Sequence, residues 1–277
     1  MTTLAERLGF AADDRLMLLN CDDLGSSHSA NMACEAAMRR GFAGAATLMV
    51  PCPWAREAVE RCADLDIGVH LTFTAEYPTY RWRALTAAAS LHDEQGYMPA
   101  KAEGVWASAS LKDVEAECRA QIDTAFRWGI DVSHLDTHMG VMQLREDYCA
   151  LYIKLAKEYR LPIRMASAGA ERAIGFAGRA QADRAGVLYN DSFVMQWGKP
   201  TRGVIEDLLP RLRPGVNEFA MHPVEDTPEL AAYDKTEAAN RTHDYACLMD
   251  TDLRGRIEAA GIKRIGWRAI RDAMRSQ

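Results

Sequence analysis

Short apolar segments alternate along this chain with segments in which apolar residues recur at every third or fourth position. The first pattern is typical of buried parallel strands, and the second is typical of amphipathic helices. The predicted strands span residues 16–20, 46–50, 67–73, 132–138, 161–166, 187–193, 216–222 and 262–267. The predicted helices span about 28–40, 53–63, 111–128, 144–159, 203–212, 236–249, 252–260 and 268–275. Eight such βα units favour an α/β fold in which helices surround a parallel sheet, as in a barrel.

Two long stretches, 74–110 and 167–186, do not fit short connections between these elements. Both follow predicted strands, so in a barrel they would lie over the rim where barrel enzymes build their sites. No internal repeat or linker rich in proline and serine interrupts the chain, and 277 residues with 48% hydrophobic content suffice for one barrel. We therefore expect a single domain over residues 1–277.

Charge and cysteine content narrow the class of protein. The 33 basic and 39 acidic side chains are interspersed and give a formal net charge of −6, so nucleic acid is not an expected partner. The seven cysteines form no CxxC pair, which favours reduced thiols in a cytoplasm. The N-terminal segment has scattered charges and no apolar stretch long enough for a signal or a membrane span. We expect a cytoplasmic protein without a membrane partner.

Polar side chains follow several predicted strands. The stretch "LLNCDDLG" places Asp22 and Asp23 directly after the first strand, where one aspartate alone could serve as a turn or helix-capping residue. The stretch "IGVHLTF" places His70 in an otherwise apolar strand, and "EFAMHP" ends another strand with His222. Because the carboxyl ends of parallel strands converge on one face of a barrel, these side chains are expected to share a site.

The fourth predicted strand adds three more polar residues. The stretch "VSHLDTHMG" has His134, Asp136 and His138 at alternate positions, which places them on one face of the strand. His138 is preferred as a site residue over His134 because it lies nearer the carboxyl end of the strand. A lone histidine in such a run is more often a hydrogen-bonded core residue than a ligand, but several strands end in this way here.

Convergent carboxylates and imidazoles indicate a divalent metal, since together they bind zinc or a similar ion with a position left for water. The predicted ligands are Asp23, His70 and His138. Asp136 is a natural partner behind a ligand, although a structural role fits it as well. Asp22 can stay ionised beside the cation and act as the general base, which would explain two adjacent aspartates at one strand end.

These stretches together resemble the YdjC-like carbohydrate deacetylases, the family of chito-oligosaccharide deacetylase. That family has a strand ending in N-A-D-D-F-G, then G-x-H-L, H-L-D-S-H-H-H and a closing H-P pair. This chain has "NCDDLG", "GVHL", "HLDTHMG" and "MHP" in the same order, and "GAATLMV" and "LPIR" are similar to the family's second and fifth strands. The resemblance implies an irregular (β/α) TIM-like barrel. It also implies a metal-dependent hydrolase that removes acetyl groups from N-acetylated sugars.

The resemblance supports the same three ligands and Asp22 as the base, and it adds His222 as a candidate acid. The family's triple histidine is reduced here to His138-Met139-Gly140, so the two later histidines are absent. Imidazole and carboxylate suit zinc, and magnesium is associated with the family, so we expect one divalent ion, zinc or magnesium. The expected partner is a small N-acetylated sugar, while the oligomeric state stays open, a homodimer included.

Further residues are candidates for supporting roles in the site, and each also has a structural alternative. Arg164, at the end of the fifth predicted strand, would orient Asp22 or form a structural salt bridge. Asp191, at the end of the sixth, would touch substrate or make a turn. Trp82, like Trp106 and Trp197, lies in or near a rim loop and would stack on a sugar ring or anchor the loop.

Three other functions stay open at this point. Two histidines and a carboxylate also describe the facial triad of iron oxygenases, although Asp22 would be idle there. A barrel phosphoesterase would need a cluster of arginines or a Gly-rich loop for phosphate, and the sequence has neither. A non-catalytic carbohydrate-binding protein would need neither Asp22 nor His222.

Overall fold

The computed structural model describes residues 2–195 and 199–276, and its centre is a parallel sheet. The strands run in the order β4-β3-β2-β1-β6-β5, and β7 also pairs with β1. Every one of these pairings is parallel. The strands are β1 (Arg15–Leu24), β2 (Ala45–Leu48), β3 (Ile67–Leu71), β4 (Leu135–Thr137), β5 (Ser192–Val194), β6 (Gly215–Met221) and β7 (Lys263–Arg264).

The predicted α/β class is confirmed, but the sheet is a curled half-barrel and not a closed TIM barrel. The strand predicted at 161–166 is reduced to single parallel bridges that Ile163 makes with Leu135 and Tyr189. Side chains take the place of a strand partner here, because Met165 N–H donates to the side-chain oxygen of Asn190, whose amide donates back to the Met165 carbonyl. An asparagine side chain satisfies this backbone as a neighbouring strand would, so no regular ladder forms.

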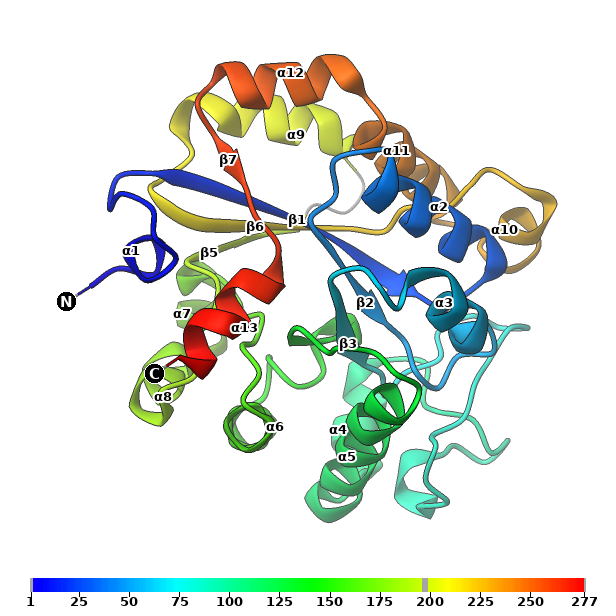
Figure 1. Ribbon diagram of the computed structural model, residues 1–277. Coiled ribbons are helices and arrows are strands. Elements are labelled where there is room, and N and C mark those ends of the chain that lie inside the picture. The colour runs from blue at the N-terminus through cyan, green and yellow to red at the C-terminus, as the bar shows by residue number, and fades with distance from the viewer. Residues whose placement is uncertain (1, 196–198, 277) are drawn as a thin grey trace.

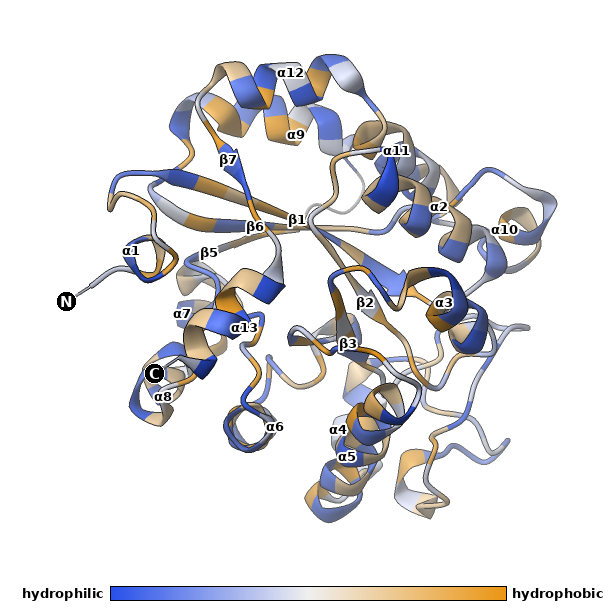
Figure 2. Cartoon of the chain, viewed as in Figure 1, coloured by the Kyte–Doolittle hydropathy of each residue, from blue (hydrophilic) through white to orange (hydrophobic). Residues whose placement is uncertain are grey.

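Helices cover the outside of the curled sheet (Figure 1). The eight predicted helices are confirmed, with ends that differ by a few residues, as α2 (His28–Arg39), α3 (Ala55–Cys62), α5 (Leu111–Arg127), α6 (Glu146–Tyr159), α9 (Thr201–Leu208), α11 (Ala238–Leu248), α12 (Thr251–Ala259) and α13 (Trp267–Arg275). The sequence pattern missed α1 (Leu4–Arg7), α4 (Ala102–Ser108), α7 (Ala168–Ile174), α8 (Gly178–Ala185) and α10 (Pro228–Tyr233). Figure 2 shows hydrophilic residues along the outer helices, as a buried sheet requires. Among the described residues, no helix is long and apolar enough to cross a membrane.

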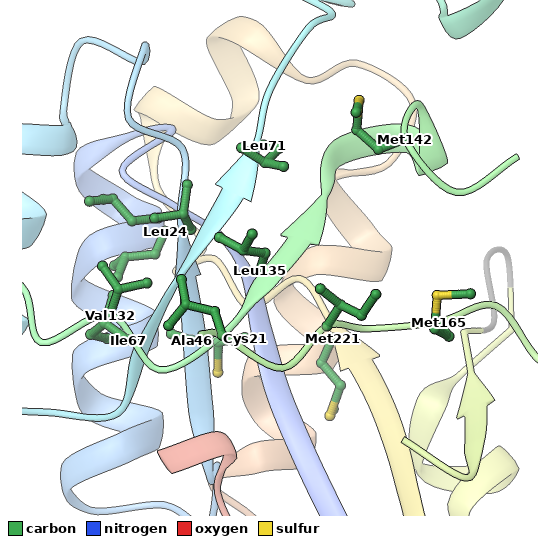
Figure 3. Close-up of a cluster of buried hydrophobic side chains, with 14 of the residues drawn as sticks. Cys21, Leu24, Ala46, Ile67, Leu71, Val132, Leu135, Met142, Met165 and Met221 are labelled. Carbon is green, nitrogen blue, oxygen red and sulfur yellow. The ribbon is translucent and has the colours of Figure 1, made fainter. Parts of the chain in front are cut away.

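Alternation along the strands separates a packing face from a functional face. Cys21 of β1 and Leu135 of β4 belong to the main apolar core (Figure 3). Leu19 of β1 belongs to the same core. Asn20, between Leu19 and Cys21, and Asp136, directly after Leu135, are buried but polar and face the inside of the curl. The same strands therefore build the core with one face and the site with the other.

The inner face is closed at its amino end by an aromatic floor. The rings of His134 and Trp267 stack with centroids 4.6 Å apart and an interplanar angle of 11°. Gly68 of β3 makes room for this stack, since a Cβ there would lie 2.4 Å from Nδ1 of His134. Burial lowers the pKa of His134 well below its usual value, so this imidazole is neutral and structural. The preference for His138 over His134 as the site residue agrees with this position.

Candidate metal centre

A bulge in β1 explains how two adjacent aspartates reach one site. Neighbouring residues of a regular strand point to opposite faces. The register of β1 against β2 advances from Cys21 opposite Ala46 to Leu24 opposite Leu48, so β1 contains one extra residue. Asp23 has φ of 64°, in the left-handed region that aspartate tolerates better than most residues. The sequence pattern had placed both aspartates directly after the first strand. In the structure they lie inside β1.

Asp23, His70 and His138 are brought together as predicted. Oδ1 of Asp23 lies 3.4 Å from Nε2 of His70 and 3.2 Å from Nδ1 of His138. One donor atom from each residue lies within 4.8 Å of the others, and all three side chains are buried. His70 comes from β3, whereas His138 begins the 3₁₀ turn η2 (His138–Gly140) directly after β4.

The chemistry of this donor set fits a divalent ion. Oδ1 of Asp23 is buried and has no hydrogen-bond partner among the described residues, although a buried carboxylate oxygen without a partner is costly. It faces two imidazole nitrogens, and one carboxylate with two imidazoles is a common zinc ligand set that leaves a position open. These residues are the ones that would hold the ion.

Each ligand has a partner on its far side. Nδ1–H of His70 donates to Oδ1 of Asp136 at 2.5 Å, and Thr47 donates to the other oxygen of that carboxylate at 2.9 Å. This hydrogen bond leaves Nε2 of His70 directed at Asp23. A carboxylate behind a ligating imidazole fixes its tautomer and its orientation. Oδ2 of Asp23 accepts from Nη1 of Arg241 at 2.8 Å, so the carboxylate presents Oδ1 to the histidines.

Without an ion, the two histidines hold protons more tightly than usual. Burial lowers the pKa of His70, but Asp136 and the other carboxylates outweigh it and raise the pKa to about 9. Burial likewise opposes charge on His138, and Glu76 and Asp23 raise its pKa to about 10. Both values lie above the usual histidine pKa of roughly 6.5. At neutral pH the ion must therefore displace these protons.

We expect zinc binding at pH 7 to release about two protons and to strengthen as the pH rises towards 9. Titration calorimetry in buffers of different ionisation enthalpy measures the number of protons released.

We expect the stability of the metal-free protein to change with pH in the opposite direction. Protonation of these histidines stabilises the fold fully below about pH 6.5, and this contribution disappears as the pH rises through 9 and 10. Zinc binding without proton release would contradict these pKa values.

Asp22 lies beside the ligands in a different environment. Arg164 holds it through two hydrogen bonds, Nη1 to Oδ2 at 2.6 Å and Nη2 to Oδ1 at 2.7 Å, and Asn20 donates to Oδ1 at 2.8 Å. Burial would raise the pKa of Asp22, but the guanidinium outweighs burial and lowers it below the usual range. Asp22 is therefore ionised and fixed in one orientation.

Arg164 is shared among three carboxylates. Besides Asp22 it contacts Oδ2 of Asp136 at 2.8 Å, and its Nε donates to Oε1 of Glu218 at 2.8 Å. Glu218, on the inner face of β6, also accepts from the indole N–H of Trp267 at 3.3 Å. Burial outweighs the arginine at Glu218 and raises its pKa to about 7. Arg164 thus connects Asp22 and Asp136, through Glu218, to Trp267 of the aromatic floor.

His222 directly follows β6 and lies near Asp22. Its Nε2 lies 3.9 Å from Oδ2 of Asp22, and its Nδ1 lies 4.0 Å from Oδ2 of Asp244. The Asp244 carboxylate also accepts from the His222 backbone N–H at 2.7 Å, which fixes the end of the strand. Burial is the largest cause that lowers the pKa of His222, so a proton on this imidazole is readily given up.

Two other predicted residues, Asp191 and Trp82, have structural partners. The strand predicted at 187–193 begins only at Ser192, so Asp191 precedes β5 and accepts from Val216 N–H at the amino end of β6. Asp191 therefore lies away from the carboxyl end of the sheet, which favours the structural alternative for this residue. Trp82 is 3% exposed, its N–H donates to the carbonyl of Thr74 in the same loop, and its ring centroid lies 6.5 Å from that of His138. Trp197 lies outside the described residues.

Sequence patterns missed Glu76, Glu218 and Arg241. Glu218 had a signal, because a charged residue in a strand that also contains Val216 and Phe219 is expected to have a buried partner. Arg241 is in a helix with many polar residues and Glu76 is in a long loop, so neither stands out in the sequence.

A family model and two curated relatives match most of this chain in sequence. A family model described as YdjC-like protein matches residues 16–259. A carbohydrate deacetylase of Thermus thermophilus is 33% identical over 98% of this chain and 99% of its own length. A carbohydrate deacetylase of Thermoanaerobacter pseudethanolicus is 25% identical over 86% of this chain and 92% of its own.

A solved structure has the same fold. It is a protein of Enterococcus faecalis V583, provisionally described as a cellobiose-phosphate cleavage protein. The two structures superpose with a TM-score of 0.82 at 23% identity, over 93% of this chain and 99% of the other. At this identity the likeness concerns the fold alone. From the family match and the full-length Thermus relative, the chain belongs to the YdjC-like protein family.

Proposed function

We propose that this protein is a metal-dependent hydrolase that removes acetyl groups from N-acetylated sugars. Its relatives from Thermus and Thermoanaerobacter are carbohydrate deacetylases. The observation that carries the proposal is an ionised Asp22 next to the donor set of Asp23, His70 and His138 at the carboxyl end of the sheet. A base and a metal site in contact are what hydrolysis of an unactivated amide requires.

The side chains divide the reaction between them. A divalent ion, when bound, supplies a Lewis acid for the acetamide carbonyl and lowers the pKa of a coordinated water. Asp22 accepts the proton of the attacking water, and Arg164 keeps its carboxylate ionised and aimed. His222, whose Nε2 lies 3.9 Å from Oδ2 of Asp22, donates a proton to the departing amine from its imidazolium form.

Zinc is the favoured ion because two of the three donors are imidazoles, whereas magnesium prefers oxygen ligands. A facial triad in an iron oxygenase would use the same three ligands. It would leave the ionised Asp22 and its arginine without a task, so hydrolysis is the better account of the whole site.

Acetate release tests the proposal directly. Purified protein is incubated with diacetylchitobiose, N-acetylglucosamine and a panel of other N-acetylated sugars, with a chelator and then with added zinc or magnesium. Release of acetate that a chelator stops and zinc or magnesium restores is the expected result, and the preferred sugar identifies the substrate class. If oxygen is consumed with iron and no acetate appears, the site is an oxygenase and the proposal is wrong.

Removing either imidazole ligand should abolish metal binding. We expect His70→Ala and His138→Ala each to weaken zinc binding by at least about a hundredfold, because each leaves only two donors. Competition with a chromophoric chelator gives the dissociation constants. His243→Ala, at an exposed position of α11, is the matched control and should bind zinc like the unchanged protein. Equal zinc affinity in all three variants would place the ion elsewhere.

A further inference from the structure

The loop after β3 contacts the metal centre through two adjacent residues, Glu76 and Tyr77. Both carboxylate oxygens of Glu76 lie close to Nε2 of His138, at 3.1 and 3.2 Å. The other ring nitrogen of His138, Nδ1, faces Asp23 at 3.2 Å. The imidazole of His138 therefore lies between the ligand carboxylate on one side and Glu76 on the other.

His70 also lies between Asp23 and a second carboxylate. The second carboxylate comes from a strand at His70 and from a loop at His138. His70 has Asp136 behind it, and Asp136 is fully buried in β4. His138 has Glu76 behind it, and the Glu76 side chain is 24% exposed and comes from a loop. A carboxylate on the far nitrogen holds the tautomer in which the near nitrogen is free to ligate. Glu76 is placed to do this for His138.

Tyr77 reaches the third ligand through an arginine. Its hydroxyl accepts from Nη2 of Arg241 at 2.8 Å, while Nη1 of the same guanidinium donates to Oδ2 of Asp23 at 2.8 Å. Asp234 holds the Nε of Arg241 at 2.9 Å, so the guanidinium is fixed on three sides. The Tyr77 ring packs edge-on against Tyr233 at 4.9 Å, which anchors the loop.

We propose that Glu76 and Tyr77 together form a positioning segment that sets the metal affinity of this site from the loop after β3. Glu76 holds His138 directly, and Tyr77 holds Asp23 through Arg241. Only His70 is supported from within the sheet, by Asp136. The proposal rests on the metal-dependent function proposed above, and it assigns the loop a role in forming the centre.

Two near-isosteric variants test the segment without removing a ligand. Glu76→Gln keeps the shape but loses the negative charge, and we expect zinc affinity to fall by roughly 10- to 100-fold. Tyr77→Phe removes the hydroxyl that accepts from Arg241, and we expect a smaller loss of roughly three- to tenfold. Zinc dissociation constants are measured by chelator competition. The visible spectrum of the cobalt-substituted protein reports the ligand geometry, and both variants should shift it.

Matched controls come from the same loop. Tyr80→Phe removes a hydroxyl that donates to the Ser26 carbonyl, and Glu94→Gln removes an exposed charge; neither side chain contacts a ligand. Both should keep the original zinc affinity and cobalt spectrum. Thermal unfolding of the metal-free variants shows whether a change is only one of stability, which would leave the cobalt spectrum unaltered.

Three results would overturn the inference, and they can be told apart from failure of the proposed function. Unchanged zinc affinity and cobalt spectrum in both variants would show that the segment does not position the ligands. Loss of zinc in Glu76→Gln as complete as in His138→Ala would make Glu76 a ligand itself. If the unchanged protein binds neither zinc nor cobalt, the metal-dependent function fails together with this inference. Zinc binding without acetate release from any sugar would contradict the function alone.

Discussion

Replacing Asp22 by asparagine is expected to lower kcat by roughly 10²- to 10⁴-fold, the usual contribution of a positioned general base. Asparagine has nearly the same shape and can still accept one hydrogen bond from Arg164, but it cannot take the proton of an attacking water. Under the proposed ligand set of Asp23, His70 and His138, zinc affinity should stay within a few fold, because Asp22 is not one of those three donors. Steady-state acetate release with the preferred sugar gives kcat, and chelator competition gives the zinc affinity.

Asp191→Asn is the matched control for this prediction. Like Asp22, Asp191 accepts hydrogen bonds, but its donor is the backbone N–H of Val216 and it lies at the amino end of the sheet. Its amide variant should keep kcat within about twofold, since it touches neither ligand nor base. Near-normal turnover in Asp22→Asn would show that another group takes the proton. A loss of zinc in the same variant would show that Asp22 ligates the ion.

The fold could be read from the sequence as far as local periodicity reaches. Helix α5 was predicted to one residue, because its apolar positions recur at helical spacing and Gly129 follows its end. The strand at 161–166 was overpredicted, since an apolar run does not reveal that the Asn190 side chain replaces a backbone partner. Closure of the sheet depends on such long-range substitutions, so the sequence could predict parallel strands but not a half-barrel.

Some features of the site could likewise be predicted from the sequence, and others could not. The convergence of Asp23, His70 and His138, the proposed ligands, was predictable because parallel strands bring their carboxyl ends to one edge of a sheet. The bulge that turns Asp23 to the same side as Asp22 was not predictable, because it depends on register against β2. Residues behind the ligands are harder still, because they arrive from elements without a motif.

Arg164 is the residue whose removal should cost the most stability. Its side chain is 3% exposed and contacts Asp22, Asp136 and Glu218, which are themselves buried. Arg164→Met keeps much of the side-chain volume but leaves these carboxylates without their counter-ion. Removing one partner of a buried ion pair typically costs about 3–5 kcal/mol, so we expect at least that loss in the free energy of unfolding. Urea denaturation of the metal-free protein measures it.

The pH dependence of this loss identifies its cause. In the Arg164→Met variant, the stranded carboxylates regain stability by taking up protons, so the deficit should shrink as the pH falls from 8 towards 5. Glu218 should protonate first, since burial already raises its pKa to about 7 beside the arginine. Arg179→Met is the control, because Arg179 donates to backbone carbonyls and holds no carboxylate. A deficit of equal size at pH 5 and pH 8 would mean that Arg164 stabilises the fold by packing, and the ionised state of Asp22 would then need another source.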